Sequence, residues 1–94
     1  MAKGDNVIYH GQVVNNAYMT IQPGSGAEWI VKNIFGNGNF EVYRTDGSNT
    51  ILITTNPGGS VENRKYRVSN TVYLTVKNVS GSTDYFGYDG TVWK

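Results

Sequence analysis

The sequence predicts an all-β fold, either a compact antiparallel β-sandwich of the jelly-roll type or a small barrel. Strand-like segments recur about every 10 residues, which is the spacing typical of sandwiches and barrels. Residues that favour turns separate these segments, and the chain of 94 residues contains 12 glycines. No stretch long enough for a stable helix avoids both glycine and runs of β-branched residues. Together these observations predict eight or so short strands.

The expected turns share residues that adopt positive φ or preset a bend. They are Asn15-Asn16, Pro23-Gly24-Ser25-Gly26, Gly36-Asn37-Gly38, Asp46-Gly47, Pro57-Gly58-Gly59, Ser80-Gly81 and Asp89-Gly90.

Residues 28–35 carry apolar side chains on both parities, which suits a strand covered on two sides or a short helical turn, and the β-branched residues favour the strand. Residues 39–54 predict a hairpin around the Asp46-Gly47 turn, with Ile51 and Ile53 continuing its inward face.

The clearest strand covers residues 71–77, where Val72, Leu74 and Val76 alternate with polar or aromatic residues. We expect these three side chains in the core, because successive residues of a strand point to opposite faces. The aromatic segment 85–94 should be docked against the sheet or against a neighbouring molecule rather than frayed.

The length favours a single domain over residues 1–94, with residues 1–5 as a flexible or contact-making N-terminal arm. A chain of this size buries a modest core, so packing or oligomer contacts should add stability. Disulfides, zinc fingers and iron–sulfur ligation are excluded because the chain has no cysteine.

The charge of the chain excludes partners that need a broad electrostatic field. Its net charge is +1 and only 16% of its residues are charged, so we expect no nucleic-acid and no membrane partner. The short basic cluster of Arg64, Lys65 and Arg67 is interpreted as a solvated loop or strand edge. No apolar run is long enough to cross a membrane, and no signal-peptide pattern opens the chain, which predicts a soluble product of a cytoplasm.

No catalytic, metal or cofactor site is expected, so the chain is predicted not to be an enzyme. His10 is the single histidine and has no motif around it, whereas hydrolytic triads need a base beside a nucleophile. The seven carboxylates are spread singly along the chain, and Asp46 and Asp89 precede glycines as turn residues do. The function should therefore lie in surfaces presented to other molecules.

Four passages of the sequence are similar to a known group of proteins. They are residues 23–34, residues 40–47 (Phe40-Glu41-Val42-Tyr43-Arg44-Thr45-Asp46-Gly47), residues 68–78 and Gly87-Tyr88-Asp89-Gly90. In these passages the chain resembles small β-rich virion structural proteins of tailed bacteriophages. The resemblance implies a capsid decoration or cement protein, or a minor tail component, that is made in the host cytoplasm and located in the virion. Its implied partners are major capsid or tail proteins and further copies of itself.

The contact surface expected for such a protein comprises the N-terminal arm through Asp5 and the aromatic C-terminal segment. The interface residues predicted there are Asp5, Tyr85, Phe86, Tyr88 and Trp93.

A tail-associated or host-recognition carbohydrate-binding module is the alternative, in which exposed Trp29, Trp93 or tyrosine rings stack on sugars. Head or tail location, oligomeric state, strand order, the choice between sandwich and barrel, and glycan binding all stay open at this point.

Overall fold

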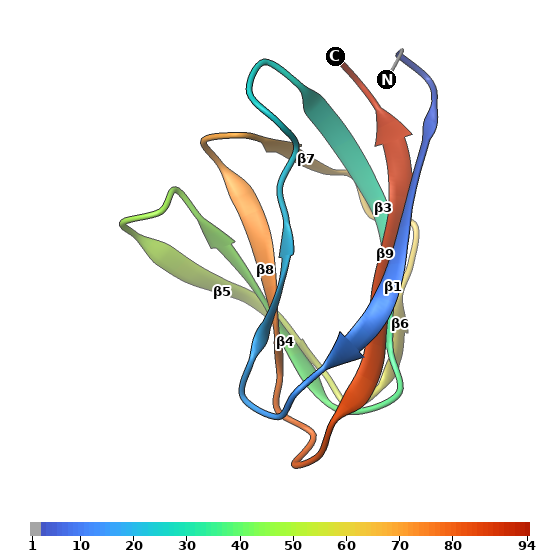
Figure 1. The fold of residues 1–94 in the computed structure, drawn as a ribbon, viewed down its shortest axis with the longest axis vertical. Helices are drawn as coiled ribbons and strands as arrows, with labels where there is room; N and C mark the ends of the chain where they lie inside the picture. The colour runs from blue at the N-terminus through green and yellow to red at the C-terminus, as the bar shows by residue number, and fades with distance from the viewer. Residues whose placement is uncertain (1–2) are drawn as a thin grey trace.

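The computed structural model describes residues 3–94, which form nine strands and no helix (Figure 1). The strands are β1 (Asn6–Val13), β2 (Tyr18–Ile21), β3 (Glu28–Gly36), β4 (Phe40–Thr45), β5 (Thr50–Asn56), β6 (Gly59–Val61), β7 (Tyr66–Ser69), β8 (Tyr73–Asn78) and β9 (Asp84–Val92). Accordingly, no helix in this part of the chain could span a membrane.

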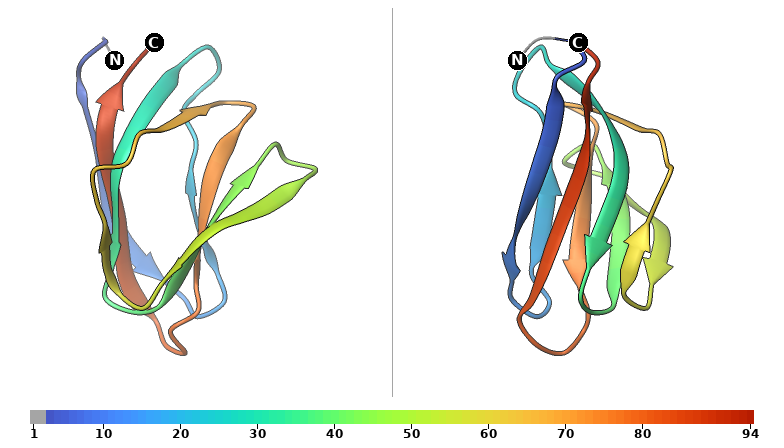
Figure 2. Two further views of the ribbon diagram at one scale, coloured as in Figure 1. Left: turned by 180° about the vertical axis from the view of Figure 1, so that it is seen from behind. Right: turned by 90° about the vertical axis from the view of Figure 1, so that its right-hand side faces the viewer.

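The strands form two antiparallel sheets that face each other, so the fold is a β-sandwich (Figures 1 and 2). The five-stranded sheet has the order β1-β9-β3-β6, with β7 also paired to β3. The four-stranded sheet has the order β2-β8-β4-β5. The all-β prediction is confirmed, and the two separate sheets make the fold a sandwich rather than a barrel.

The core lies between the sheets and is built from alternate residues of most strands. Phe40 of β4 and Phe86 of β9, both fully buried, meet edge to face in it, with ring centroids 5.7 Å apart. The other buried apolar side chains are Val7, Val13, Met19, Ile21, Val31, Ile34, Val42, Val61, Val68, Leu74, Val76, Tyr88 and Val92.

A β-bulge explains why β3 carries apolar residues on both parities. Its register with β9 shifts between Val31 and Asn33, so Val31 and Ile34 both reach the core although they differ in parity. A bulge adds one residue and reverses the alternation beyond it. Trp29, Ile30 and Phe35 remain only half-buried. The prediction that this strand is covered on both faces is therefore only partly confirmed.

The predicted turn at Asp89-Gly90 is wrong, because both residues lie inside β9. Gly90 is needed there for close packing: a Cβ atom at this position would collide with the carbonyl oxygen of Ile30 on β3. Gly47 and Gly81 do adopt positive φ, of 94° in both cases, in the turns predicted for them.

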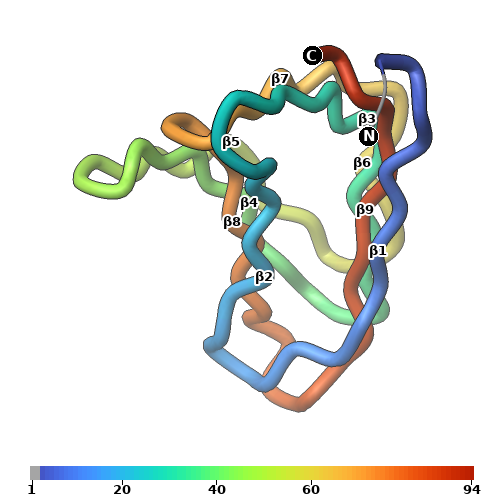
Figure 3. Tube along the Cα trace, turned by 45° about the horizontal axis from the view of Figure 1, so that its top comes forward, coloured from blue at the N-terminus to red at the C-terminus, as the bar shows by residue number. Residues whose placement is uncertain are grey.

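The predicted hairpin is confirmed as β4 and β5, but its inward face is only partly buried. Ile51 is 66% exposed and Ile53 39% exposed, which corrects their expected core position. The far end of this hairpin diverges from the five-stranded sheet and projects from the body (Figures 1 and 3). No opposite layer covers the side chains at that end.

The strand predicted for residues 71–77 begins two residues later, at Tyr73. Leu74 and Val76 are buried as expected, whereas Val72 is only half-buried. Val72 belongs to a turn closed by Ser69, whose backbone N–H donates to the Val72 carbonyl at 2.7 Å.

Residues at the two ends of the described chain are joined to each other. The Gly4 N–H donates to the carbonyl of Val92 at 2.8 Å, and the Val92 N–H donates to the carbonyl of Asp5 at 2.9 Å. The predicted arm is therefore held against β9 at these two positions, and its residues 1–2 lie outside the described part. The aromatic C-terminal segment is docked as predicted, with β9 between β1 and β3 (Figure 2).

Candidate interaction surfaces

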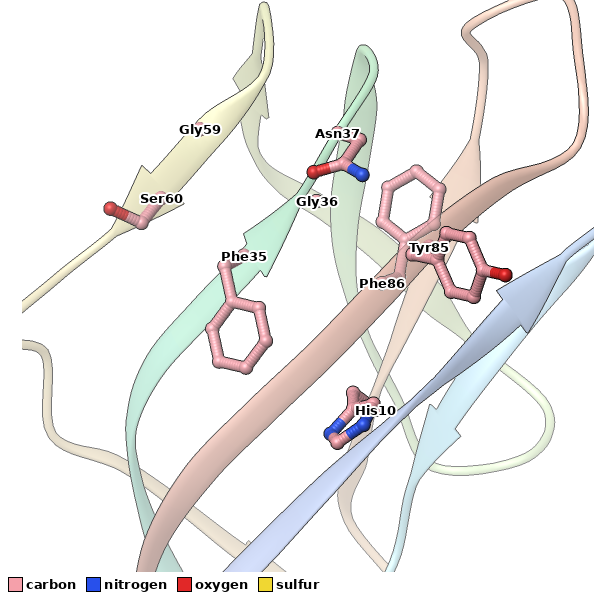
Figure 4. Close-up of a pocket in the computed structure, with 8 residues that line it drawn as sticks. All are labelled: His10, Phe35, Gly36, Asn37, Gly59, Ser60, Tyr85 and Phe86. Atoms are coloured by element: carbon pink, nitrogen blue, oxygen red, sulfur yellow. The ribbon is translucent and has the colours of Figure 1, made fainter.

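An apolar pocket of about 450 Å³ lies on the outer face of the five-stranded sheet (Figure 4). Gly87 of β9 pairs with His10 of β1 on one side and with Phe35 of β3 on the other. The missing side chain leaves room for the Phe35 ring, which a Cβ atom at Gly87 would meet at 2.5 Å. Tyr85 and Asn37 border the pocket at its far end. The result is an open depression with aromatic walls.

This pocket holds no catalytic arrangement. The exposed imidazole of His10 makes no hydrogen bond or ion pair with any residue of 3–94, so nothing orients it as a base. Ser60, which also lines the pocket, donates its hydroxyl to Glu62 at 2.6 Å. A flat apolar group could lie in the depression against the Phe35 ring.

Within residues 3–94, no three or more His, Asp or Glu side chains gather closely enough to hold a metal ion. Asp46 acts within its turn instead, where one carboxylate oxygen accepts from the N–H groups of Asn49 at 2.7 Å and Ser48 at 2.9 Å. These backbone hydrogen bonds, with that of Asn49 first, lower the pKa of the Asp46 carboxyl.

The five predicted interface residues do not form one surface. Phe86 and Tyr88 point into the core, where burial also raises the pKa of the Tyr88 hydroxyl. The Phe86 ring is therefore closed to a partner, whereas Tyr88 only borders the groove beside Tyr9. Tyr85 alternates with them and is exposed on the outer face. Strand alternation in β9 is the physical reason for this correction, because consecutive aromatic residues point to opposite sides. The backbone carbonyl of Asp5 is bound to β9.

Trp93 is exposed, but two cations lie over its ring. Lys3 Nζ is 4.8 Å and Arg67 Cζ 5.1 Å from the ring centroid, within the range of cation–π attraction. Trp29 is half-buried and packs against Tyr88, at 6.4 Å between ring centroids. Neither tryptophan offers the open ring that the sugar-stacking prediction required.

One edge of the sandwich exposes an apolar surface formed by Tyr9, Val14 and Tyr18, which we name the β1–β2 surface. Val14 is 62% exposed, and both tyrosines are exposed as well. A groove of about 340 Å³ runs between these residues and reaches the buried Met19. β1 and β2 are edge strands of their respective sheets, so each also presents an unpaired backbone edge.

A second apolar surface lies at the opposite edge of the four-stranded sheet, and we name it the β5 surface. Its residues are Ile51, Leu52 and Ile53, three consecutive exposed side chains. They fall on both faces of a strand that pairs only with β4. Sequence reasoning missed this surface because it assigned Ile51 and Ile53 to the core. A run of three apolar residues, apolar on both faces, was the available signal.

No protein-family model and no curated protein matches this sequence. Among solved structures, the chain is similar to the core of the NLP protein of Drosophila, a structure described for its pentamer formation and histone binding. The TM-score is 0.55 at 17% sequence identity, and the match covers 93% of this chain and 98% of the Drosophila chain. The likeness establishes the fold over nearly the whole length of both chains.

The predicted role as a bacteriophage capsid decoration protein, with its tail-associated alternative, is corrected by this finding. The similar structure is the core of the Drosophila NLP protein, described for its pentamer formation and histone binding rather than for a role in a virus particle. Turn and strand patterns carried that resemblance, and such patterns are shared by β-sandwiches of unrelated function. The virion location stays a prediction without support from the fold.

Proposed function

We propose that this domain is a non-catalytic protein-binding module whose copies associate head to tail into a closed ring. The observation that carries the proposal is the presence of two different exposed apolar surfaces at opposite edges of one sandwich. Contiguous exposed apolar residues mark interaction sites, because soluble monomers rarely leave them uncovered. When the two contacting surfaces differ, each added copy leaves one surface free, and the chain of copies closes when the rotation permits.

The edges themselves suit such an association. The β1–β2 surface includes a groove that opens toward the core, whereas the β5 surface projects from the body (Figure 3). A projecting strand and an open groove are complementary in shape. The Drosophila protein of similar fold forms a pentamer, which supports ring closure for this architecture.

Histone binding belongs to the Drosophila protein, and the charge of this chain does not favour it here. Histones are strongly basic, and a basic partner associates with a surface of the opposite sign. The present chain carries a net charge of +1 and exposes Arg64, Lys65 and Arg67 in one segment. We therefore propose that the partner is a protein other than a histone.

Light scattering after size exclusion tests the ring. We expect a mass that is an integer multiple of 10.4 kDa and higher than one copy. Val14→Lys on the β1–β2 surface and Ile51→Lys on the β5 surface should each abolish the ring. Ile8→Lys is the matched control, because Ile8 is 70% exposed but lies outside both surfaces.

Mixing the two variants gives the sharper test. The Val14→Lys copy keeps its β5 surface and the Ile51→Lys copy keeps its β1–β2 surface, so a head-to-tail contact predicts a one-to-one heterodimer. A monomeric wild type, or variants that stay apart when mixed, would refute the ring. Retention of core histones by the wild type at physiological salt would overturn the exclusion of histones.

A further inference from the structure

A pocket of about 200 Å³ opens between the projecting β4–β5 hairpin and β7, and we name it the basic pocket. Its lining consists of Arg44, Ile53, Lys65, Tyr66, Arg67 and Leu74. Leu74 is buried and Tyr66 half-buried, so the floor is apolar, while the cationic residues Arg44 and Lys65 border it.

The cations of this pocket lack counter-charges. Neither Arg44 nor Lys65 makes an ion pair or a side-chain hydrogen bond with any residue in the described range 3–94, and no carboxylate lines the pocket. The guanidinium of Arg67 lies over the Trp93 ring instead, since Arg67 alternates on β7 with the core-facing Tyr66 and Val68. Two like charges beside an apolar floor, those of Arg44 and Lys65, attract an anion.

The size of the pocket limits what can enter it. Pockets for drug-sized ligands commonly measure about 300–1,000 Å³, whereas about 200 Å³ accommodates one apolar side chain. Ile53 belongs to β5, whose second backbone edge is unpaired, and an extended peptide can add to such an edge by main-chain hydrogen bonds.

We propose that the basic pocket binds an acidic peptide segment of a partner protein. One apolar side chain of the segment enters the pocket, and flanking carboxylates pair with Arg44 and Lys65. This inference rests on the proposed function as a protein-binding module and names the chemistry of the partner, but it does not require the ring.

The probe is a fluorescein-labelled pentapeptide with a central leucine and two glutamates on each side, followed by fluorescence anisotropy with the full chain. Two control peptides replace the leucine by glycine or the glutamates by lysine. We expect only the first peptide to bind, and its affinity to fall as the ionic strength rises, because salt screens the charge pairs.

Substitutions locate the binding. Arg44→Glu and Lys65→Glu should each weaken binding by about fivefold, as expected for losing one partly exposed charge pair. Lys77→Glu is the matched control, since it makes the same charge change on the outer face of the four-stranded sheet. Lys65 lies in an exposed loop, so its variant remains informative if Arg44→Glu fails to fold.

Several results would overturn the inference. Equal binding of the glycine peptide would remove the role of the pocket, and equal weakening by Lys77→Glu would indicate a general charge effect. Binding of laurate without binding of the peptide would identify a fatty acid as the occupant instead. Because Ile53 belongs both to the β5 surface and to the basic pocket, a ring can cover the peptide site, so the titration is repeated with Val14→Lys, which is expected to be monomeric with its β5 surface free. A Val14→Lys variant that does not bind the peptide overturns this inference alone, and a monomeric wild type that binds it overturns only the ring.

Discussion

Asn78 Nδ2 lies 2.7 Å from the carbonyl oxygen of Val13, so a side-chain hydrogen bond joins the last residue of β8 to the last residue of β1. The same amide nitrogen donates to the Ser82 carbonyl at 2.8 Å, and Oδ1 accepts from the Ser80 N–H at 2.9 Å. Asn78 is completely buried. One buried side chain thus links the two sheets at one end of the sandwich.

Replacing Asn78 should be costly. We expect Asn78→Ala to lower the free energy of unfolding by about 3 kcal/mol, because three hydrogen bonds vanish and buried backbone groups lose partners. Asn78→Asp should be no better, since a carboxylate cannot donate to the carbonyls of Val13 and Ser82. Urea unfolding measures the effect. Asn39→Ala, at an exposed position, is the control, and an equal loss in both variants would contradict this explanation.

Glycine in the middle of β9 is required by packing. Gly90→Ala should destabilise the protein by about 2 kcal/mol or more, because the added methyl group meets the backbone of Ile30 rather than a movable side chain. Gly24→Ala should change stability by less than about 0.5 kcal/mol, since an added Cβ there has no neighbour within 4 Å. Thermal unfolding of the two variants compares them, and similar losses would disprove the packing argument.

Tyr43 should ionise at unusually high pH. Its hydroxyl donates to Glu41 at 2.5 Å, and this hydrogen bond, with desolvation and the nearby charge, raises the pKa of Tyr43 from 10.0 to about 12. The folded state holds the proton more tightly than the unfolded state, so the associated stability is present below pH 10 and is lost as pH rises through about 12. NMR titration of the tyrosine ring carbons measures the pKa of Tyr43.

Two Glu→Gln variants test the cause of this pKa shift, one at Glu41 and one, as the control, at Glu62. Glu41→Gln should return the pKa of Tyr43 toward its ordinary value. Glu62→Gln, whose carboxylate accepts from Ser60, should leave the pKa unchanged. A shift that persists in Glu41→Gln would mean that the carboxylate is not the cause.

Association should appear in stability as well as in mass. Because contacts between copies favour the folded state by mass action, the unfolding temperature of the wild type should rise with protein concentration. Ile51→Lys should remove this dependence while Ile8→Lys keeps it. A wild-type unfolding temperature that is constant over a hundredfold concentration range, roughly, would count against the ring.

The sequence predicted those features that follow from local patterns. Alternation placed Leu74 and Val76 in the core, and glycine in turn contexts located Gly47 and Gly81 correctly. The same rule misplaced Gly90, because a glycine required by a neighbouring strand looks the same in sequence as one required by a turn.

The candidate surfaces depended on tertiary arrangement and could not be predicted in the same way. Alternation put Ile51 on the inward face of its sheet, but whether a second layer lies opposite depends on where the hairpin leaves the sandwich. The basic pocket joins Arg44 to Lys65, which are 21 positions apart, and no pattern in either segment indicates the other. The Arg64, Lys65 and Arg67 cluster is exposed as predicted. The structure adds that Lys65 borders the basic pocket together with Arg44, and this is where we propose that an acidic peptide binds.

The position of β9 between β1 and β3 has a consequence for the order of folding. Within the described residues, β1 and β3 are joined only through β9, which follows the other eight strands in the chain, so the five-stranded sheet cannot close before β9 has been synthesised. The pairings β2-β8 and β4-β8 become available earlier, and contacts between distant segments form slowly. The edges of β1 and β3 that face β9 therefore stay open until β9 emerges, and open edges are prone to wrong pairing.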